Sequence, residues 1–418
     1  MNIIKLNEIQ KINNTIEYCF ESDGDIVKYF SEKKFVISYP EIIEKVPDSI
    51  ACIPFVCNVL PIVWITDAVL VVPELDEIFY KSISEFKKGY QEMFPETDFL
   101  GRIIINKIVP NHYSNNGKAA MFYSGGLDSV QTLISHLNEN PILLTVWGSD
   151  IRYDNVSGWK LVQKAINEVA DKYRLKQCTI RSTFREFDNE SLLDKDFSKL
   201  LKDNWWHGVK HGIGLLGHVA PYAWIHQINI MYIASSYCFE DGKVRCASSP
   251  TIDNYVKFMD CVVVHDGFEY NRQKKVNNIV RFCRATKDYV PFHVCWQSQS
   301  GSNCCYCEKC YRTMTELIVE GENPVNYGFS NATRSLKEME AFIVNNKNKH
   351  IEILKQQWIY TQKRAKENKK NLRRSMFYKY IKWILKADFE NPERLKLSFY
   401  WRFRKYIYKS NIYKWLRK

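Results

Sequence analysis

The segment between Ala119 and Leu137 constrains the fold of this 418-residue chain more than any other. An apolar run over Ala119–Tyr123 predicts a buried strand, a turn with two adjacent glycines follows, and Ser129–Leu137 predicts a helix with one apolar face. Strands that alternate with helices in this way are typical of a parallel sheet with helices on both faces. We therefore expect an α/β fold with a Rossmann-like, doubly wound parallel sheet. The other elements of this sheet are predicted as strands at Pro141–Trp147, Cys178–Ser182 and Ile228–Ala234, and as helices at Trp159–Tyr173 and Gly208–Gln227.

The length of the chain and the changes in its pattern predict three domains. Residues 1–115 form an N-terminal α+β region, residues 116–330 carry the parallel sheet, and residues 331–418 are helical and basic. Within the first region we expect short strands at Lys34–Ser38 and Ile62–Val72 and an amphipathic helix at Asp76–Met93.

The apolar stretch Ile50–Pro73 needs separate consideration. It contains Pro54, Pro61 and Asp67, and it is rich in valine and isoleucine. A membrane-spanning helix would not normally carry two prolines and an aspartate near its centre, so we expect two short buried strands joined by a turn.

The distribution of charge and the cysteine content indicate the cellular compartment in which we expect the protein. The net charge is +12, but residues 363–418 hold 19 Lys and Arg against 4 Asp and Glu, so this tail contributes +15 and the rest of the chain −3. The thirteen cysteines are an odd number in a long chain, and the first residues are too polar for a secretory signal. We therefore expect the protein in the reducing cytoplasm, where it could also lie peripherally at the inner face of the membrane.

The glycine turn has the composition of a phosphate-binding loop. Its glycines allow the backbone to approach an anion, while helix N–H groups and the hydroxyls of Ser124 and Ser129 can donate to phosphate oxygens. Asp128 would repel phosphate unless Mg²⁺ lay between them. A plain strand–helix turn is the alternative, and the complete string favours the phosphate loop. Its members are Ser124, Gly125, Gly126, Leu127, Asp128 and Ser129.

Four cysteines have the spacing of a metal site, C-x8-C-x2-C-x2-C. Closely spaced thiolates on a turn suit tetrahedral Zn²⁺, so we expect a closed, structural zinc site. Buried thiols or a redox pair are the alternatives. Cys305 interrupts the spacing and is not expected to bind, and the remaining eight cysteines are expected to be buried thiols. The predicted ligands are Cys295, Cys304, Cys307 and Cys310.

The loop and the cysteine spacing, in this order, resemble the PP-loop ATP pyrophosphatases, and within them the 7-cyano-7-deazaguanine synthase family of the queuosine pathway. The resemblance covers about residues 117–325 and implies an adenine nucleotide alpha-hydrolase type of domain. It implies that ATP is cleaved to AMP and pyrophosphate, that a carboxylate is adenylated, and that ammonia then gives an amide and, after a second activation, a nitrile. The six loop residues would hold pyrophosphate and Mg²⁺, and the four cysteines zinc.

The same resemblance assigns roles to residues outside the two motifs. Lys275 would counter charge as pyrophosphate leaves, and His211 would line the nucleotide site. The chain also departs from the family. Residues 1–115 and 335–418 have no counterpart there, the second strand ends in Trp147-Gly148-Ser149-Asp150 instead of an aromatic-Gly-Gln run, and Arg312 follows the last cysteine by two residues instead of three.

Three weaker signals leave alternatives open. His207 and His211 are four residues apart and could bind a metal, or they are ordinary histidines, as His218 would be. Ser235 and Ser236 follow a predicted strand, where open α/β sheets bind ligands, but strand-end serines are also common in turns. The run after His265-Asp266-Gly267, with Arg272, Lys274 and Lys275, offers cations for an anionic ligand or forms a solvated helix face.

The first functional hypothesis is an AMP-forming, ATP-dependent C–N ligase that acts on a small carboxylate with ammonia or an amine donor. The alternatives are a PP-loop enzyme that modifies tRNA or another RNA, and a non-catalytic nucleotide-binding protein at the membrane in a cell-surface glycan or defence pathway. The tail over residues 363–418 mixes basic and aromatic residues and could bind an anionic membrane or RNA. A helical hairpin packed on the protein is the alternative for the tail, and a homodimer is compatible with the sequence.

Overall fold

The computed structural model describes residues 2–295, 297–298, 302–399 and 401–402. By packing, the chain divides into two compact units. Unit 1 consists of residues 1–124, 132–237 and 242–268, and unit 2 of residues 125–131, 238–241 and 269–418. Each unit is described by itself below.

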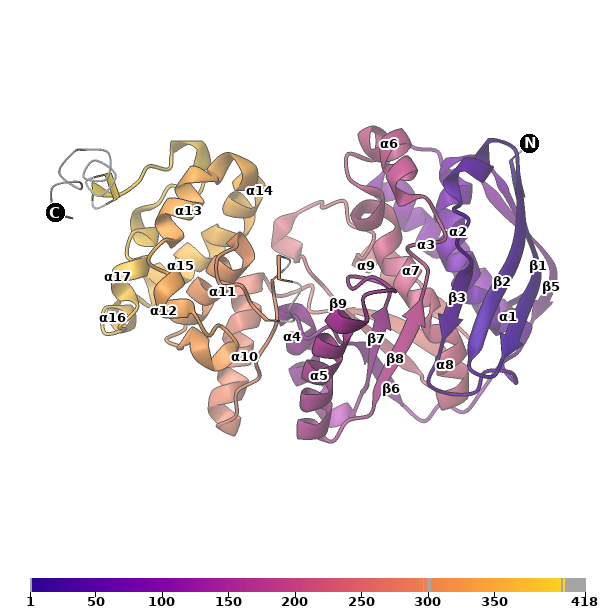
Figure 1. Cartoon of the computed structure of the whole chain (residues 1–418), viewed down its shortest axis with the longest axis horizontal. Helices are drawn as coiled ribbons and strands as arrows, with labels where there is room; N and C mark the ends of the chain where they lie inside the picture. The colour runs from indigo at the N-terminus through magenta and orange to yellow at the C-terminus, as the bar shows by residue number, and fades with distance from the viewer. Residues whose placement is uncertain (1, 296, 299–301, 400, 403–418) are drawn as a thin grey trace. The chain divides into compact units, whose positions relative to one another are not determined.

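Unit 1 is built on an eleven-stranded sheet among its described residues, in the order β10-β11-β9-β6-β7-β8-β3-β2-β1-β4-β5 (Figure 1). The five central strands β11, β9, β6, β7 and β8 are all parallel to one another. The prediction of an α/β fold with a mostly parallel sheet is therefore confirmed. The strands are β1 (Ile3–Ile12), β2 (Thr15–Asp23), β3 (Phe35–Ser38), β4 (Val69–Asp76), β5 (Arg102–Val109), β6 (Ala119–Phe122), β7 (Ile142–Trp147), β8 (Gln177–Ser182), β9 (Ile230–Ala234), β10 (Lys257–Phe258) and β11 (Cys261–Asp266).

The order of the five parallel strands creates a switch point beside β6. Along the chain, β7 and β8 add on one side of β6, whereas β9 and β11 add on the other. This is the strand order of a Rossmann-like half, in which ligands bind outside the carboxyl ends of the strands where the order reverses. The glycine turn follows β6 directly, so the chain leaves the sheet at this point.

Both faces of the parallel strands are covered. On β7, Ile142 and Leu144 point to the large core, whereas Leu143 between them points to the opposite face and is equally buried. Helix α5 (Val156–Tyr173) is amphipathic and packs near β8, and helix α4 (Leu127–His136) begins directly after the glycine turn. Strands buried on both sides explain the nearly continuous apolar runs in the sequence.

The sheet continues without interruption into the first hundred residues. β3 pairs antiparallel with β8, β1 to β3 form an antiparallel meander, and β4 and β5 add in parallel beyond β1. The boundary predicted near residue 115 thus falls between strands of a single sheet. The predicted helix Asp76–Met93 is present as α3 (Glu77–Met93), with the Asp76 carboxylate accepting from the Phe79 N–H at 2.9 Å.

The prediction for Ile50–Pro73 is wrong in its first part. The segment forms helices α1 (Asp48–Ala51) and α2 (Ile53–Ile65) before β4 begins at Val69. Nearly every residue of α2 is buried, so the helix has no polar face and its sequence lacks helical periodicity. Pro54 lies in its first turn, where its missing N–H has no cost, and Asn58 donates to the Pro54 and Gly214 carbonyls.

The helix predicted over Gly208–Gln227 is present in three pieces. They are a π-helical turn η3 (Trp206–Lys210), α7 (His211–Gly217) and α8 (Val219–His226). Smaller helices of unit 1 are α6 (Glu190–Leu201) and α9 (Pro250–Asp253). Among the described residues, every helix is too short or too polar to cross a membrane.

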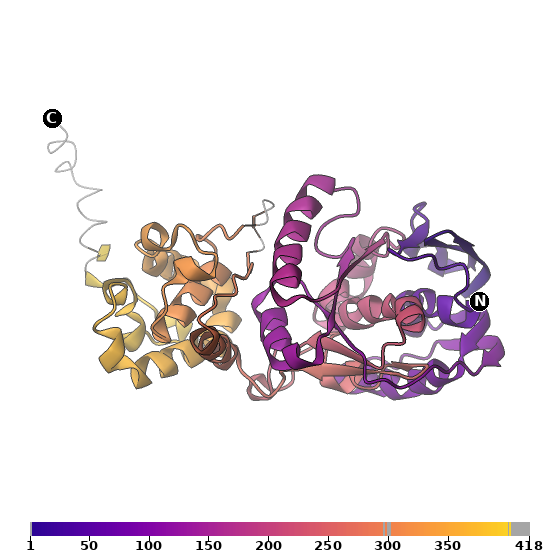
Figure 2. The ribbon, with the colours of Figure 1, turned by 90° about the horizontal axis from the view of Figure 1, so that it is seen from below.

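Unit 2 is helical over its described residues, which Figures 1 and 2 draw mainly in orange and yellow. Its core gathers around α11, with Met314, Leu317 and Ile318 buried, and around Trp358, whose ring lies near Phe389. Its helices are α10 (Arg272–Thr286), α11 (Glu308–Val319), α12 (Ala332–Ser335), α13 (Met339–Asn345), α14 (Ile351–Ile353), η7 (Leu354–Trp358), α15 (Ile359–Glu367), α16 (Lys369–Leu372) and α17 (Tyr378–Ile381).

The first part of the basic tail, residues 363–399, packs as part of unit 2. Leu372, Ile381 and Phe389 are buried in unit 2, and Arg364 donates to both Glu320 oxygens at 2.7 and 2.8 Å. Residues 363–399 are thus part of a folded unit. Tyr400 and residues 403–418, with Phe403, Arg404, Lys405, Tyr406, Trp415 and Arg417, lie outside the described residues.

Candidate functional site

The glycine turn leaves an open, backbone-lined loop at the start of α4. Gly125 has a φ of +71°, a conformation that side chains other than glycine rarely adopt, and a Cβ built on it would meet no atom within 4 Å. Ser124 is exposed, Gly125 and Gly126 are half-buried, and the Ser129 hydroxyl donates to the Gly126 carbonyl at 3.0 Å. An open space therefore adjoins the Gly125 backbone, just before the ten-residue helix α4 begins.

Leu127 differs from the other members of the predicted loop. Its side chain is buried, so only its backbone N–H is available to a ligand. Asp128 follows as the one carboxylate of the loop, and its side chain is 22 % exposed.

Asp128 lies beside two buried cations of α10. Its carboxylate is 3.2 Å from the Lys275 ammonium and 3.8 Å from the Arg272 guanidinium. Burial raises the pKa of Asp128, but the charges of Lys275, Arg272 and Lys309 outweigh burial and leave the pKa below its usual value. Asp128 is therefore an anion held among cations. The sequence prediction that Lys275 acts close to the loop fits this geometry, whereas Lys274 is exposed on the helix surface.

Helix α11 adds a row of buried charges that the sequence analysis missed. Glu308, Arg312 and Glu316 follow one another at intervals of four residues, and all three are buried. Arg312 pairs with Glu308 at 3.0 Å, and Arg272 pairs with Glu316 at 3.2 Å. Charges at this spacing usually mark a solvated helix face, so their burial could not be read from the pattern.

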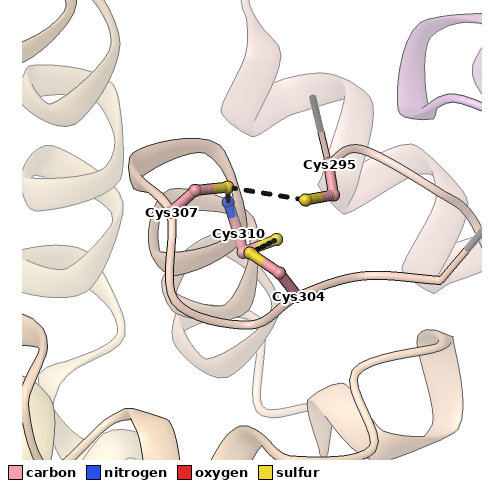
Figure 3. A group of neighbouring side chains, drawn as sticks. All are labelled: Cys295, Cys304, Cys307 and Cys310. Atoms are coloured by element: carbon pink, nitrogen blue, oxygen red, sulfur yellow. Dashed lines mark hydrogen bonds between the residues drawn. The ribbon is translucent and has the colours of Figure 1, made fainter. Parts of the chain in front are cut away.

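The four predicted cysteines come together in unit 2 (Figure 3). Their sulfur atoms all lie within 4.8 Å of one another, and the Cys295–Cys307 and Cys304–Cys310 pairs are each 3.9 Å apart. Four sulfurs bound to zinc at about 2.3 Å would be separated by about 3.8 Å. The cluster can therefore hold a metal ion such as zinc, and it is the metal-ligand group found among the described residues.

Backbone N–H groups stabilise negative charge on these sulfurs. Cys307 caps helix α11 and accepts from the Cys310 N–H at 3.5 Å, while Cys304 accepts from the Tyr306 N–H at 3.3 Å. Hydrogen bonding from the Cys310 thiol lowers the pKa of Cys307 to about 5. Thiolates at a helix N-terminus are the form that binds metal.

Cys305 is not part of the cluster. Its φ is +65°, and its thiol points to the Asn303 carbonyl. The thirteen cysteines form no disulfide, and outside the cluster all are buried except the half-buried Cys19.

The loop and the cysteine cluster are neighbours within unit 2. The His293 N–H, two residues before Cys295, donates to the Gly125 carbonyl at 2.8 Å. Helix α11, which starts at Cys307, carries the Lys309 charge that acts on Asp128. A metal at the four cysteines would therefore fix two segments that contact the loop.

The other predicted residues lie in unit 1. His211 is on α7, with its ring packed edge-on against Trp206 at 4.9 Å, and burial lowers its pKa. His218 is fully buried and bonded to Gly214 and Ser182. No third ligand converges with the histidines among the described residues. Ser235 is buried and donates to the Tyr237 carbonyl, and Ser236 is exposed.

Comparisons with known proteins give no further guide. No protein-family model, no curated protein and no solved structure matches this chain.

Proposed function

We propose that this protein is an AMP-forming, ATP-dependent ligase with a PP-loop, which adenylates a small carboxylate for amide or nitrile formation. The observation that carries the proposal is the loop with Gly125 at positive φ, followed at once by Asp128 beside Lys275 and Arg272. A plain strand–helix turn that binds no ligand would need neither the partly exposed Asp128 carboxylate nor the two buried cations beside it.

The fit to a polyphosphate rests on three features of these residues. The Gly125 backbone adjoins an open space, the N-terminus of α4 follows directly after the glycine turn, and Lys275 is almost completely buried so that its ammonium is held toward the loop. Bound Mg²⁺–ATP would supply an activated phosphoryl centre and a pyrophosphate leaving group.

The chain's own residues have distinct roles in this proposal. Asp128 would be a Mg²⁺ ligand and would orient the metal against the phosphate oxygens. Lys275 would balance the charge that develops on pyrophosphate, as a fixed cation close to a leaving group does. Ser124 and Ser129 would donate hydrogen bonds to the oxygens. His211 belongs to unit 1, and its role at a nucleotide site stays a prediction from the sequence.

The experiment measures the products of ATP cleavage by the full chain, with Mg²⁺ and a mixture of small carboxylic acids and ammonium. We expect AMP and pyrophosphate, and exchange of labelled pyrophosphate into ATP. Asp128→Asn should lower the exchange rate by about 100-fold or more, because an amide does not supply the negative charge. Asp154→Asn, at a carboxylate that is 69 % exposed, is the matched control. ADP and phosphate as products would rule the proposal out.

A second proposal concerns the partner of unit 2. Lys363, Lys366, Lys370 and Arg373, here named the basic stripe, are exposed at intervals of three, four and three residues across α15 and α16. The opposite side of these helices is buried through Ala365 and Leu372. We propose that the basic stripe binds an anionic membrane surface, since each such cation adds about 1 kcal/mol near anionic lipid. The exposed Met376, three residues after Arg373, offers an apolar contact next to the basic stripe.

A further inference from the structure

Strand β5 ends the sheet of unit 1 and has one unpaired edge (Figure 1). In the strand order of the described residues, β5 pairs with β4 on one side and is the last strand on the other. The Arg102 N–H donates to the Ala68 carbonyl at 3.0 Å, just before β4 begins. Successive residues of a strand direct their N–H and C=O groups to opposite edges, so Ile103, Ile105 and Lys107 direct theirs to the free edge. These groups are open to another strand.

The two ends of the sheet differ in how they resist such pairing. β10, at the opposite end, has only two residues. β5 has eight residues, holds one register against β4 over Arg102–Val109, and contains no proline. Short edge strands, prolines and bulges are devices by which proteins prevent pairing at an edge. β5 has none of the three, and four of its eight residues are isoleucines, which favour strands.

The side chains of β5 alternate between the core and an open face of the sheet. Ile103 and Ile105 are partly buried and pack against the apolar core. Ile104 and Ile108 point to the other face and are 45 % and 43 % exposed. Asn106 lies between them on that face and is exposed as well. Two isoleucines that flank an amide are therefore left open beside the free edge.

This pattern is complementary to itself when two copies of β5 run antiparallel about a twofold axis at Asn106. Ile104 of each copy then lies opposite Ile108 of the other copy, and Asn106 lies opposite its own counterpart. In the same register, Ile105 of one copy lies opposite Lys107 of the other, and their outward N–H and C=O groups can exchange hydrogen bonds. A shift by one residue would instead place core-facing positions opposite positions of the open face.

The charges of β5 do not oppose this pairing. The strand carries Arg102 and Lys107 and no acidic residue, and the Lys107 ammonium lies 3.7 Å from the Glu74 carboxylate. The charge of Lys107 is thus balanced within its own chain. In the register centred on Asn106, Arg102 lies opposite Pro110 of the other copy, so that no two cations face each other directly.

We propose that two copies of this protein associate through the free edges of β5, which joins their sheets across a twofold axis at Asn106. The surface belongs to unit 1 and uses no residue of the glycine loop or of the four cysteines, so the inference goes beyond the proposed ligase. A single strand pair buries less than the roughly 1,600 Å² of a standard interface, and we therefore expect a reversible dimer with a dissociation constant in the micromolar range.

The first test measures the mass of the full-length protein by sedimentation equilibrium over a range of concentrations. We expect a monomer–dimer equilibrium. Ile104→Lys should weaken it by at least about tenfold, because a charge then faces an isoleucine. Lys107→Pro removes an outward N–H, which an edge strand tolerates, and should weaken it as well. Val262→Lys, at a valine of β11 that is 41 % exposed, is the matched control and should leave the equilibrium unchanged.

Two results of this test would overturn the proposal. One is a wild-type protein that stays monomeric at every concentration, which needs no variant. The other is equal weakening by Ile104→Lys and Val262→Lys, because association would then not depend on β5.

The second test introduces a cysteine on the twofold axis. Opposed residues that share no ladder hydrogen bond have Cα atoms about 4.5 Å apart, which a disulfide can span. Asn106→Cys should therefore give a covalent dimer on mild oxidation, linked through the introduced cysteine, as peptide mass spectrometry would show. Ile104→Cys should cross-link much less, because its two copies would lie about 13 Å apart along the strands. The wild-type protein, with Cys19 half-buried on β2, gives the background.

The cross-linking result also decides the register. A dimer that does not cross-link through Asn106→Cys associates through another surface, which would overturn the proposal. Equal cross-linking by Asn106→Cys and Ile104→Cys would indicate random collisions and would overturn it too.

Discussion

Unit 1 buries a continuous apolar core along a long sheet, whereas unit 2 is assembled from helices that are mostly shorter than three turns. Their buried charges differ as well. In unit 1, Lys210 and Asp188 form an ion pair at 2.6 Å in which both side chains are fully buried. In unit 2, the Asp128 end of the charged cluster is 22 % exposed. The Lys210–Asp188 pair is closed to solvent and therefore to a ligand, whereas the cluster around Asp128 is accessible at one end.

The comparison indicates how each unit is stabilised. The described helices of unit 2 have between 3 and 15 residues, a length at which a helix is at best marginally stable alone, so their stability comes from packing. In unit 2, packing is supplemented by the four cysteines and by ion pairs such as Arg312–Glu308 and Arg364–Glu320. We therefore expect unit 2 to depend on metal and charge, and unit 1 on apolar burial.

Removal of metal should have the largest effect, and only on unit 2. The purified chain should carry about one zinc ion, because one four-thiolate site is present. Chelation, or Cys307→Ser, should unfold the helical region around α11, since metal binding to a structural site contributes on the order of 10 kcal/mol to folding. Elemental analysis and a thermal scan test this expectation.

Cys178→Ser is the control for this experiment, because that thiol belongs to the sheet of unit 1. The unfolding transition of unit 1 should remain after chelation. A zinc-free protein in which all transitions persist would contradict the dependence of unit 2 on metal.

The second effect concerns the buried ion pairs. Lys210→Met leaves Asp188 buried without its cation and should lower the free energy of unfolding by about 3–5 kcal/mol. Arg312→Met should cost less, because Glu308 still accepts from the Trp358 indole N–H at 2.7 Å. Urea unfolding measures both values. The double variant Lys210→Met with Asp188→Leu should recover most of the lost free energy of unfolding. If Lys210→Met and Arg312→Met lower that free energy equally, the buried ion pairs of the two units do not differ in this way.

The sequence was sufficient for features that local patterns encode. The strands around the glycine turn were recognised because apolar runs end at glycines and prolines, and their order places the turn at the switch point beside β6. The four cysteines could be grouped because all lie within 16 residues of one another. Thiols this close in sequence can meet without any knowledge of the remaining fold.

What the sequence did not reveal depends on contacts between distant segments. Helix α2 was taken for strands because burial on every side removes its periodicity. The Glu308–Arg312–Glu316 row resembles a solvated face, and only packing shows that it is buried.

The third effect tests the exposed charge of unit 2. Replacing Lys363, Lys366 and Lys370 by glutamine should weaken binding to phosphatidylserine vesicles by about 100-fold, which corresponds to three cations of about 1 kcal/mol each. Substitution is preferable to deletion of residues 363–418, because Leu372 and Arg364 are part of the packing of unit 2. Vesicle sedimentation at increasing salt measures the effect, which should disappear as screening shortens to a few ångströms.

The control replaces three exposed lysines of unit 1, each of which is paired with a glutamate: Lys81, Lys88 and Lys164. These changes should leave vesicle binding nearly unchanged. RNA that displaces the protein from vesicles and binds more tightly would reverse the choice of partner. Binding that is equally reduced by both sets of substitutions would show that only net charge matters.

The smallest effect is a pH dependence confined to unit 1. Burial lowers the pKa of His218 to about 3, and the neutral ring bonds the Gly214 carbonyl at 2.7 Å and the Ser182 hydroxyl at 2.8 Å. An unfolded histidine titrates near pH 6.5, so protons bind preferentially to the unfolded chain below that pH. The contribution of His218 is therefore complete above about pH 6.5 and is lost as the pH falls toward 3, which amounts to about 2 kcal/mol at pH 5. Urea unfolding of the sheet transition at pH 7 and pH 5 should show this loss in the wild type and not in His218→Gln, while His112→Gln, at a histidine that is 63 % exposed, should behave as the wild type. If His218→Gln and the wild type show the same pH dependence, other titratable groups of unit 1 cause it. The stability contribution of the buried His218 would then not report how well the interior of unit 1 excludes water.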